Sequence, residues 1–411
     1  MSEWLQCVTC SREFDTGVVR YTCDCGGLIE VRRSPIAFRR EVFDQRRGSR
    51  LPIDQSGVWR FREAVLDVTD PVTHPEGSTR LYEREGVFFK HEGENPTGSF
   101  KDRGMTVAIT QAVRLGARAV ACASTGNTSS SLAAYAAQAK LGAVVFVPAG
   151  RVSAGKLAQT LAYGARCLQV RGDFDAAMRL VLEASRQLGL YLVNSINPFR
   201  IEGQKTIVWE LLQDLEWQPP DWIIVPAGNL GNTSAFGKAL IEAREAGWIA
   251  RMPRLAAIQA AGANPFFRSY REKFGARHRV TPETVATAIR IGDPVSYDKA
   301  VAAIRATNGI VEEVTDAELM TAKRDIDRMG IGCEPASATT LAGLRKLRAA
   351  GVIGARERVV CVLTGHVLKD VGAITPDPDQ MIEIDADLKE VEKALERRQP
   401  AGRSAGNLPA G

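Results

Sequence analysis

The sequence lacks any long uninterrupted hydrophobic run. None of its apolar stretches reaches the roughly 18 residues that a membrane-spanning helix needs, although 45% of the 411 residues are hydrophobic. The N-terminus also lacks the charged-then-apolar order of a secretory signal. We therefore expect no membrane association and a cytoplasmic location. A chain of this length can bury more than one core, so two or three domains are expected.

Dense positive charge and histidine are also scarce. The net charge of +5 is spread along the chain, apart from short pairs such as Arg32-Arg33 and Arg46-Arg47. A nucleic-acid-binding surface needs a denser basic patch, so we expect a small-molecule partner and no nucleic acid. The four histidines supply no metal triad, and the sequence has no internal repeat.

One lysine stands directly after a loop that interrupts regular structure. The pattern of 87–91 predicts a strand, Asn95-Pro96 and Gly98 break it, and apolar residues at helical spacing resume over 105–115. Lys101 therefore falls in a first helical turn. The helix dipole disfavours a cation there and lowers the lysine pKa, which suits covalent catalysis through a Schiff base.

Three further polar loops each follow a predicted strand. Segment 123–131 carries several hydroxyl residues and precedes a helix, so its hydroxyls and free N–H groups suit a carboxylate. Segment 225–233 has two glycines that let backbone N–H groups converge on a phosphate. Thr364 follows another predicted strand, at its C-terminal end, and open α/β sheets bind ligands at the C-terminal ends of their strands. Together with Lys101, these loops predict a pyridoxal phosphate site.

The motifs at these positions resemble those of the threonine synthase family, pyridoxal phosphate enzymes of the tryptophan-synthase-β type. Residues 96–105 are similar to that family's cofactor-lysine motif, and 124–128 to its substrate-carboxylate loop. Three further similar segments follow in the family's order, at 194–205, 288–292 and 334–338. Because the similarity extends from about residue 77 to 370, chance is a poor explanation.

The resemblance implies a reaction and a role for each site residue. The implied reaction converts O-phospho-L-homoserine and water to L-threonine and phosphate, with Lys101 holding the cofactor and shuttling protons. The implied cofactor-binding residues are Lys101, Asn127 at the phenolic oxygen, Gly228, Asn229, Leu230, Gly231 and Asn232 around the phosphate, and Thr364 at the ring nitrogen. The implied substrate-binding residues are Ser124, Thr125 and Thr128 for the carboxylate, and Asn194, Ser195, Arg200 and Lys156 for the phosphate. We also expect a homodimer.

The eight cysteines form two groups. Cys7, Cys10, Cys23 and Cys25 are arranged as C-x2-C, a spacer and C-x-C, which resembles a zinc ribbon with a tetrahedral thiolate site, although the second pair is one residue short. We predict structural zinc, with reduced, metal-free cysteines as the alternative; disulfides are disfavoured in a cytoplasmic protein. Some threonine synthases resemble this chain in carrying a short Cys-rich N-terminal extension. The remaining cysteines, at scattered positions, resemble small hydrophobic residues.

Beyond the cysteines, strand and helix patterns alternate from about residue 78, which is typical of parallel sheets with crossover helices. Strands are predicted at 87–91, 118–123, 143–148, 166–170, 191–193, 222–225, 255–258 and 358–363, and helices at 105–115, 132–140, 157–163, 174–188, 206–215 and 234–246. The resemblance implies an α/β protein of fold type II, with two open, mostly parallel sheets, flanking helices and a small Cys-rich module.

We expect five consecutive parts. They are a zinc-ribbon-like module at 1–33, an arm and the first part of the large domain at 34–103, a small α/β domain at 104–198, the large α/β domain at 199–396, and a flexible tail at 397–411.

Several of these features have simpler interpretations. The hydroxyls of 124–131 could only cap a helix, although they exceed what one cap needs. Residues 228–232 could form an ordinary turn, and Arg200 could merely start a helix. For His366 a solvated loop residue is the preferred interpretation, and Glu334 needs no role beyond a favourable position at a helix N-terminus.

Two alternative functions follow from these interpretations. A related lyase, such as a threonine or serine dehydratase or a cysteate synthase, would share Lys101 but differ at the second anion site, where Asn194, Ser195 and Arg200 discriminate. A protein that binds nucleic acid or another protein through the Cys-rich module would carry an inactive enzyme body. The intact motif around Lys101 argues against the second alternative.

Overall fold

The computed structural model describes residues 2–150, 154–374 and 380–396. Residues up to Asp370 form one compact unit, and the segment from Val371, which contains α14 (Leu388–Glu396), is a second unit described by itself. The tail predicted at 397–411 lies outside the described residues. Among the described helices, none combines the length and the apolar character that crossing a bilayer requires.

The larger sheet has six strands in the order β12-β11-β10-β13-β5-β4, all parallel except the antiparallel edge strand β4. Its strands are β4 (Leu81–Arg84), β5 (Val87–His91), β10 (Trp222–Pro226), β11 (Arg254–Ala260), β12 (Ile310–Val314) and β13 (Val359–Leu363). Every residue of β10 is buried, and its alternate side chains enter two different cores. Such a continuous apolar strand fits a parallel sheet that helices cover on both faces.

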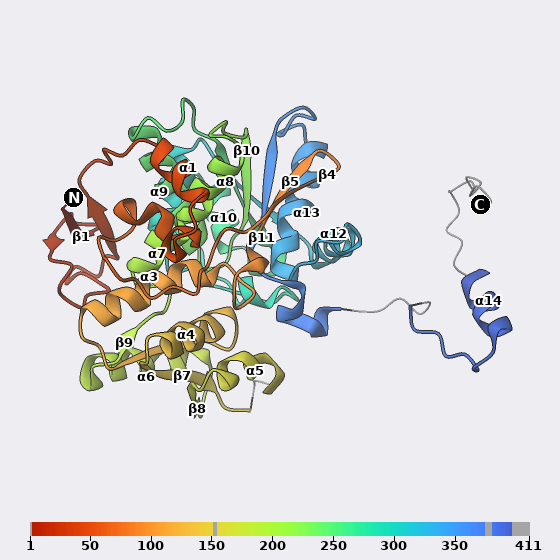
Figure 1. Cartoon of the computed structure of the whole chain (residues 1–411), viewed down its shortest axis with the longest axis horizontal. Coiled ribbons are helices and arrows are strands. Elements are labelled where there is room, and N and C mark those ends of the chain that lie inside the picture. Colours follow the sequence, from red (N-terminus) through yellow and green to blue (C-terminus); the bar gives the residue numbers. More distant parts are fainter. Residues whose placement is uncertain (1, 151–153, 375–379, 397–411) are drawn as a thin grey trace. The chain divides into compact units, whose positions relative to one another are not determined.

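The smaller sheet has four parallel strands in the order β8-β7-β6-β9. They are β6 (Ala119–Ala123), β7 (Gly142–Pro148), β8 (Arg166–Val170) and β9 (Tyr191–Leu192). Helices α4 (Asn127–Gln138), α5 (Ala154–Ala162) and α6 (Phe174–Leu188) surround it at the bottom of Figure 1, below the larger sheet. The two mostly parallel sheets confirm the predicted α/β fold class, whereas the domain boundaries stay predictions.

Helix α3 (Lys101–Arg114) lies between the two sheets in Figure 1 and crosses α7 (Phe199–Gln204) at very short range. A Cβ added at Gly203 would lie 1.7 Å from the Arg103 carbonyl oxygen, and one added at Gly104 would lie 2.8 Å from that of Arg200. Only glycine permits this approach. The crossing brings Lys101 and Arg200 to the same pocket.

The remaining helices of this part are α8 (Thr206–Asp214), α9 (Gly231–Glu245), α10 (Pro265–Arg271), α11 (Tyr297–Ala306), α12 (Asp316–Arg328) and α13 (Pro335–Ala349).

The Cys-rich module, predicted at 1–33, contains a small antiparallel sheet of β1 (Glu3–Cys7), β2 (Glu13–Phe14) and β3 (Ile29–Arg33), in the order β2-β1-β3. Its buried residues Leu5, Ile29 and Val31 belong to the same core as those of the large sheet. The module is therefore packed into the enzyme body. The arm that follows contains α1 (Glu41–Arg47), α2 (Pro52–Gln55) and the 3-10 helix η1 (Trp59–Ala64).

Most predicted elements are present, and their errors lie at the ends. The strand at 166–170 and the helix at 174–188 match at both ends. Helix α4 begins five residues earlier than predicted, and α3 begins four residues before its predicted apolar pattern, at Lys101, which was expected in a first helical turn. Both helices start with polar residues that line a pocket, which hides their first turns from an apolar pattern. Strands β4 and β12 and the module's three strands were not predicted, because they are short and partly exposed.

Candidate active site

A cavity of about 690 Å³ lies where the C-terminal ends of strands from both sheets meet. It brings together nearly all of the predicted site residues, which come from segments far apart in the sequence. The predicted residues that line it are Lys101, Ser124, Thr125, Asn127, Thr128, Asn194, Ser195, Arg200, Gly228, Asn229, Leu230, Gly231, Asn232 and Thr364. The side chain of Lys156, the remaining predicted residue of this site, lies outside the described part of the structure.

Lys101 is the first residue of α3, as predicted from its place in a first helical turn. Its Nζ lies 4.0 Å from the centre of the Phe100 ring, and no carboxylate of the described residues comes within ion-pair distance of it. Burial and then the nearby Arg200 cation lower the pKa of Lys101 to about 7, with Glu334 opposing them. A large fraction of this amine is therefore neutral near pH 7, as a nucleophilic lysine requires.

Four helices begin at this cavity. The N-termini of α3, α4, α9 and α13 all have pocket-lining residues in their first turn, and the N-cap side chain of none of these four helices accepts a capping hydrogen bond. In α9, Asn232 Oδ1 accepts the Thr233 N–H at 2.8 Å. Each terminus leaves unpaired N–H groups and about half a positive charge. These helix termini therefore add positive potential to the cavity, which favours anionic groups there and disfavours a protonated Lys101.

The loop before α9 has the geometry of a phosphate-binding turn. Leu230 takes the left-handed conformation, with φ 64°, and the N–H groups of Gly228, Asn229 and Leu230 have no acceptor among the described residues. A Cβ at Gly228 would lie 2.9 Å from Ile289 Cα, so glycine is needed there. Asn232 Nδ2 donates to the Pro226 carbonyl at 2.7 Å and fixes the turn. These free N–H groups at a helix N-terminus fit a phosphate group.

Arg200 is a buried cation without a counter-charge. Its side chain is only 2% exposed, Nη1 donates to the Val193 carbonyl at 3.1 Å, and Nε has no partner. No carboxylate of the described residues lies within 4.0 Å of it, and burial lowers the pKa of Arg200 to about 10. Leaving a charge and a donor unpaired inside a protein is costly unless a ligand compensates them. The simpler interpretation of Arg200, a helix-start residue, therefore does not explain its position.

Asn194 has a different environment from the one expected for a direct ligand. Its side-chain amide both accepts from the Ala123 N–H, at 3.0 Å, and donates to the Ala123 carbonyl, at 2.9 Å. The amide thus ties the end of β9 to the start of the 124–128 loop. Ser195, the next residue, accepts a hydrogen bond from Asn229 Nδ2 at 3.4 Å.

Among the pocket residues that were not assigned to the site from the sequence, three make polar or ring contacts that connect its walls. Glu334 accepts from Asn127 Nδ2 at 2.9 Å and from Thr364 Oγ1 at 3.3 Å, so it joins two predicted cofactor-binding residues, and burial raises its pKa. His366 lies in a loop, as expected, but it is partly buried, lines the pocket and stacks on His91 with ring centres 6.2 Å apart.

The third is Lys369. Its Nζ donates to the Thr97 carbonyl, Ser130 Oγ and Gln159 Oε1, at 3.0, 3.0 and 2.5 Å. No local sequence pattern indicates such a role, because the acceptors come from three separate segments.

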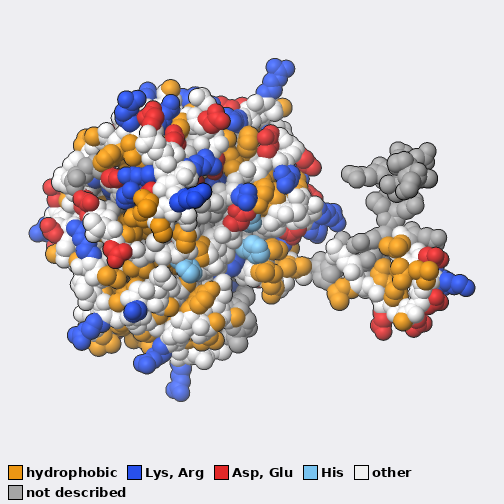
Figure 2. Space-filling view, viewed as in Figure 1, with side chains coloured by type: hydrophobic (Ala, Val, Ile, Leu, Met, Phe, Trp, Pro, Cys, Tyr) orange, Lys and Arg blue, Asp and Glu red, His pale blue; other side chains and the backbone are white. Residues whose placement is uncertain are grey.

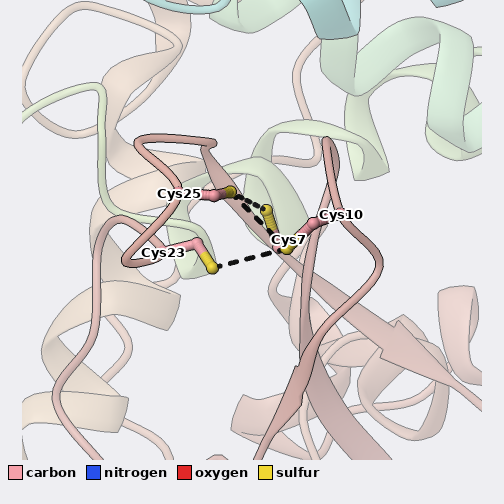
Figure 3. A group of neighbouring side chains, drawn as sticks. All are labelled: Cys7, Cys10, Cys23 and Cys25. Carbon is pink, nitrogen blue, oxygen red and sulfur yellow. Dashed lines mark hydrogen bonds between the residues drawn. The ribbon is translucent and has the colours of Figure 1, made fainter.

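The four N-terminal cysteines form a second, separate site. Their sulfur atoms point toward one another from two loops (Figure 3) and all lie within 4.8 Å of one another, with three contacts at 3.5–3.6 Å. Tetrahedral zinc with Zn–S bonds of about 2.3 Å separates sulfur atoms by about 3.8 Å. The Thr9 N–H also donates to Cys7 Sγ at 3.4 Å, which favours a thiolate. The donor set and its spacing fit a tetrahedral metal ion.

Comparison with known proteins agrees with this geometry. Residues 69–365 match the family described as "Pyridoxal-phosphate dependent enzyme", which defines the class of the protein. Threonine synthases of Methanocaldococcus jannaschii and Methanosarcina acetivorans are each 44% identical to it, over 95% of this chain and 98% of the relative. The solved structure of Escherichia coli threonine synthase covers 97% of the chain, and the chain 100% of it, with a TM-score of 0.68; at 18% identity this likeness shows the fold alone. The chain belongs to the threonine synthase family.

Proposed function

We propose that this enzyme converts O-phospho-L-homoserine and water to L-threonine and phosphate. The observation that carries the proposal is Arg200, a buried guanidinium that lines the cavity with Ser195 and has no carboxylate of the described residues within ion-pair distance. A substrate with a second anionic group would supply the missing counter-charge. The names of the relatives, all threonine synthases, support the same reaction.

The residues of the cavity fit pyridoxal phosphate. Lys101 would hold its aldehyde carbon, the free N–H groups of 228–232 its phosphate, Asn127 its phenolic oxygen and Thr364 its ring nitrogen. When bound, the cofactor supplies an electron sink for the carbanion chemistry. The Thr364 hydroxyl lies 3.1 Å from Ser337 Oγ. Because this hydroxyl is uncharged and is not a strong acid, the ring nitrogen beside it would stay largely unprotonated.

The substrate would bind across the two sheets. Ser124, Thr125 and Thr128, at the uncapped N-terminus of α4, would hold its carboxylate, and Ser195 and Arg200 its phosphate. In this pose the Lys101 amine would take protons from Cα and Cβ as the Cγ–O bond to phosphate breaks. It would then return protons to Cγ and Cα as the hydroxyl of water adds at Cβ. Asn194 would contribute by holding the 124–128 loop through Ala123, and Lys156 stays a proposed phosphate contact.

Product analysis tests this proposal directly. Purified enzyme with pyridoxal phosphate should release phosphate and threonine in equal amounts from O-phospho-L-homoserine. A dehydratase would instead form ammonia and a 2-oxo acid from threonine or serine. Formation of the 2-oxo acid without phosphate release would reject the proposal in favour of that alternative.

We also propose that Cys7, Cys10, Cys23 and Cys25 hold structural zinc. The freshly reduced protein should then contain about one zinc per chain, and replacing Cys10 and Cys25 by serine should remove it while the cofactor stays bound. An absence of zinc in the reduced protein would reject this site.

The location and the assembly are further proposals. Eight free cysteines are in keeping with a reducing cytoplasm. On the face shown in Figure 2, acidic and basic side chains are interspersed, which supports the absence of a nucleic-acid partner. A homodimer is carried over from the family resemblance, and light scattering of the purified enzyme tests it.

A further inference from the structure

The Cys-rich module contacts the enzyme body directly behind the segment that carries Asn194 and Ser195. Strand β9 is at the edge of the small sheet, so its outward N–H groups need partners from elsewhere. The Tyr21 hydroxyl accepts the Leu192 N–H at 2.7 Å, and the Tyr21 ring packs edge-on against Tyr191 with centres 6.0 Å apart. Tyr21 therefore closes the edge of the strand that leads into the candidate phosphate site.

A second contact of the module reaches the helix that carries Arg200. Arg33, the last residue of β3, donates to Glu202, which is fully buried on α7 two residues after Arg200. Glu202 also contacts Lys205 at 2.6 Å and Lys238, so its charge stays compensated without Arg33. The Arg33 contact thus fixes the position of α7 more than it neutralises Glu202.

These two contacts belong to one continuous network. Leu192 is held by Tyr21, the next residue Val193 accepts the hydrogen bond from Arg200, and Arg200 lies on the same short helix as Glu202, which is held by Arg33. The backbone from 192 to 202 is therefore attached to the module at both ends, with Ser195 and Arg200 between them.

The four cysteines lie close to both attachment points within the module. Tyr21 precedes Cys23 by two residues, and Cys7 pairs directly with Ile29 on β3, the strand that ends at Arg33. Lys299 on α11 donates to the Ile29 carbonyl at 2.6 Å, which fixes the start of β3 against the body. A metal ion bound by the thiolates would restrain both the Tyr21 loop and β3.

We propose that the Cys-rich module supports the site for the substrate's leaving phosphate, with Tyr21 and Arg33 as positioning residues for Ser195 and Arg200. Loss of the metal loosens the 192–202 segment and weakens phosphate recognition, while the cofactor site, built on the larger sheet and α3, keeps its geometry. This inference rests on the proposed function, because it assumes that Ser195 and Arg200 bind the phosphate.

Matched variants separate this role from simple stabilisation. Tyr21→Phe keeps the ring and removes only the acceptor of the Leu192 N–H. Arg33→Met removes the contact with Glu202. Arg32→Met is the control, because the Arg32 side chain is 52% exposed and forms an ion pair with Glu30 two residues earlier in the same strand.

The holoenzyme is then tested with inorganic phosphate and with O-phospho-L-homoserine. For Tyr21→Phe and Arg33→Met we expect roughly three- to tenfold weaker phosphate binding by calorimetry and a similar rise in KM, which corresponds to the loss of one hydrogen bond. The kcat, the cofactor absorption and the spectral response to threonine should be nearly unchanged. Amide hydrogen exchange should accelerate over residues 191–204, and removal of zinc by a chelator should do the same.

Three results would overturn the inference. In the first, the wild-type enzyme turns over O-phospho-L-homoserine, but both variants bind phosphate as tightly as the wild type and show the same rate of amide hydrogen exchange at 191–204. The module then does not support the phosphate site, although the proposed function stands. An equal effect of Arg32→Met would indicate general destabilisation instead. If wild-type enzyme neither binds phosphate nor acts on the substrate, the proposed function fails and the inference fails with it.

Discussion

Two groups of buried cations lie along α3, and the protein compensates only one of them. Arg103 donates to Glu92 and Glu210, each at 2.7 Å, and these carboxylates raise its pKa although burial opposes them. Lys101, two residues earlier, has no carboxylate within ion-pair distance among the described residues, and burial lowers its pKa to about 7. Arg200, which lines the same cavity, also has no carboxylate of the described residues within ion-pair distance, and burial lowers its pKa to about 10. The compensated group stabilises the fold, whereas the uncompensated group awaits anionic ligands.

The surroundings of Arg103 show what full compensation requires. Its cluster joins three buried cations and three carboxylates from four parts of the chain: Arg60, Lys90, Arg103, Glu92, Glu210 and Asp214. The half-exposed Arg47 also pairs with Asp214. The pocket cations have four uncapped helix N-termini around them, which add positive charge. Binding of cofactor and substrate should therefore stabilise the folded protein by linkage, as any ligand specific to the native state does.

The largest effect is expected from removing the catalytic cation. Lys101→Ala should lower turnover by more than about 10³-fold and abolish the cofactor absorption band, because no other lysine is placed at the start of α3. The thermal stability of the cofactor-free protein should not fall, since Lys101 forms no ion pair with any of the described residues, and the comparison is made on apoenzyme so that lost cofactor binding does not contribute. Lys140→Ala, at an exposed loop position, is the control for activity. Threonine formation at the wild-type rate in Lys101→Ala would contradict the assignment.

The opposite result is expected two residues further along the helix. Arg103→Met leaves Glu92 and Glu210 buried with fewer partners, which should lower the free energy of unfolding by about 3–5 kcal/mol. Urea denaturation measures this difference. Arg345→Met, which breaks a half-exposed pair with Asp325, should cost less than about 1 kcal/mol. Equal stability of Arg103→Met and the wild type would mean that the comparison between the two groups is wrong.

A third expected effect concerns Arg200, the uncompensated cation of the substrate site. Arg200→Ala should weaken transition-state binding of O-phospho-L-homoserine by about 2–4 kcal/mol, because a charge-assisted hydrogen bond is lost. Threonine has no phosphate, so its spectral titration should remain nearly unchanged. Steady-state kinetics and this titration together measure the split. Equal weakening of both ligands, or of neither, would show that Arg200 is structural and that the substrate assignment is wrong.

The contrast also explains which parts of the site could be predicted from the sequence. Lys101 was predictable because its role depends on local features, a loop break followed by a helix start. Glu334 and Lys369 were not, because Asn127 and Ser130, which they contact, are more than 200 residues away in the sequence. Strand order and the attachment of the Cys-rich module likewise depend on contacts between distant segments. The motifs therefore predicted the cavity's chemistry, whereas the residues that connect its walls required the structure.

The smallest expected effect is the pH dependence of cofactor incorporation, which measures how far Lys101 is uncompensated. Only the neutral amine can attack the cofactor's aldehyde, so the rate at which apoenzyme takes up pyridoxal phosphate should rise as pH increases through about 7. An ordinary lysine would place this rise near pH 10.4. Because Arg200 lowers the pKa of Lys101 and Glu334 raises it, Arg200→Ala should move the midpoint upward and Glu334→Gln should move it downward.

Absorbance changes after rapid mixing of each apoenzyme with the cofactor, recorded over a pH series, give the midpoints of the wild type and of the two variants. A wild-type midpoint above about 9 would mean that water or a nearby anion compensates Lys101 after all, and the distinction from Arg103 would lose its physical basis.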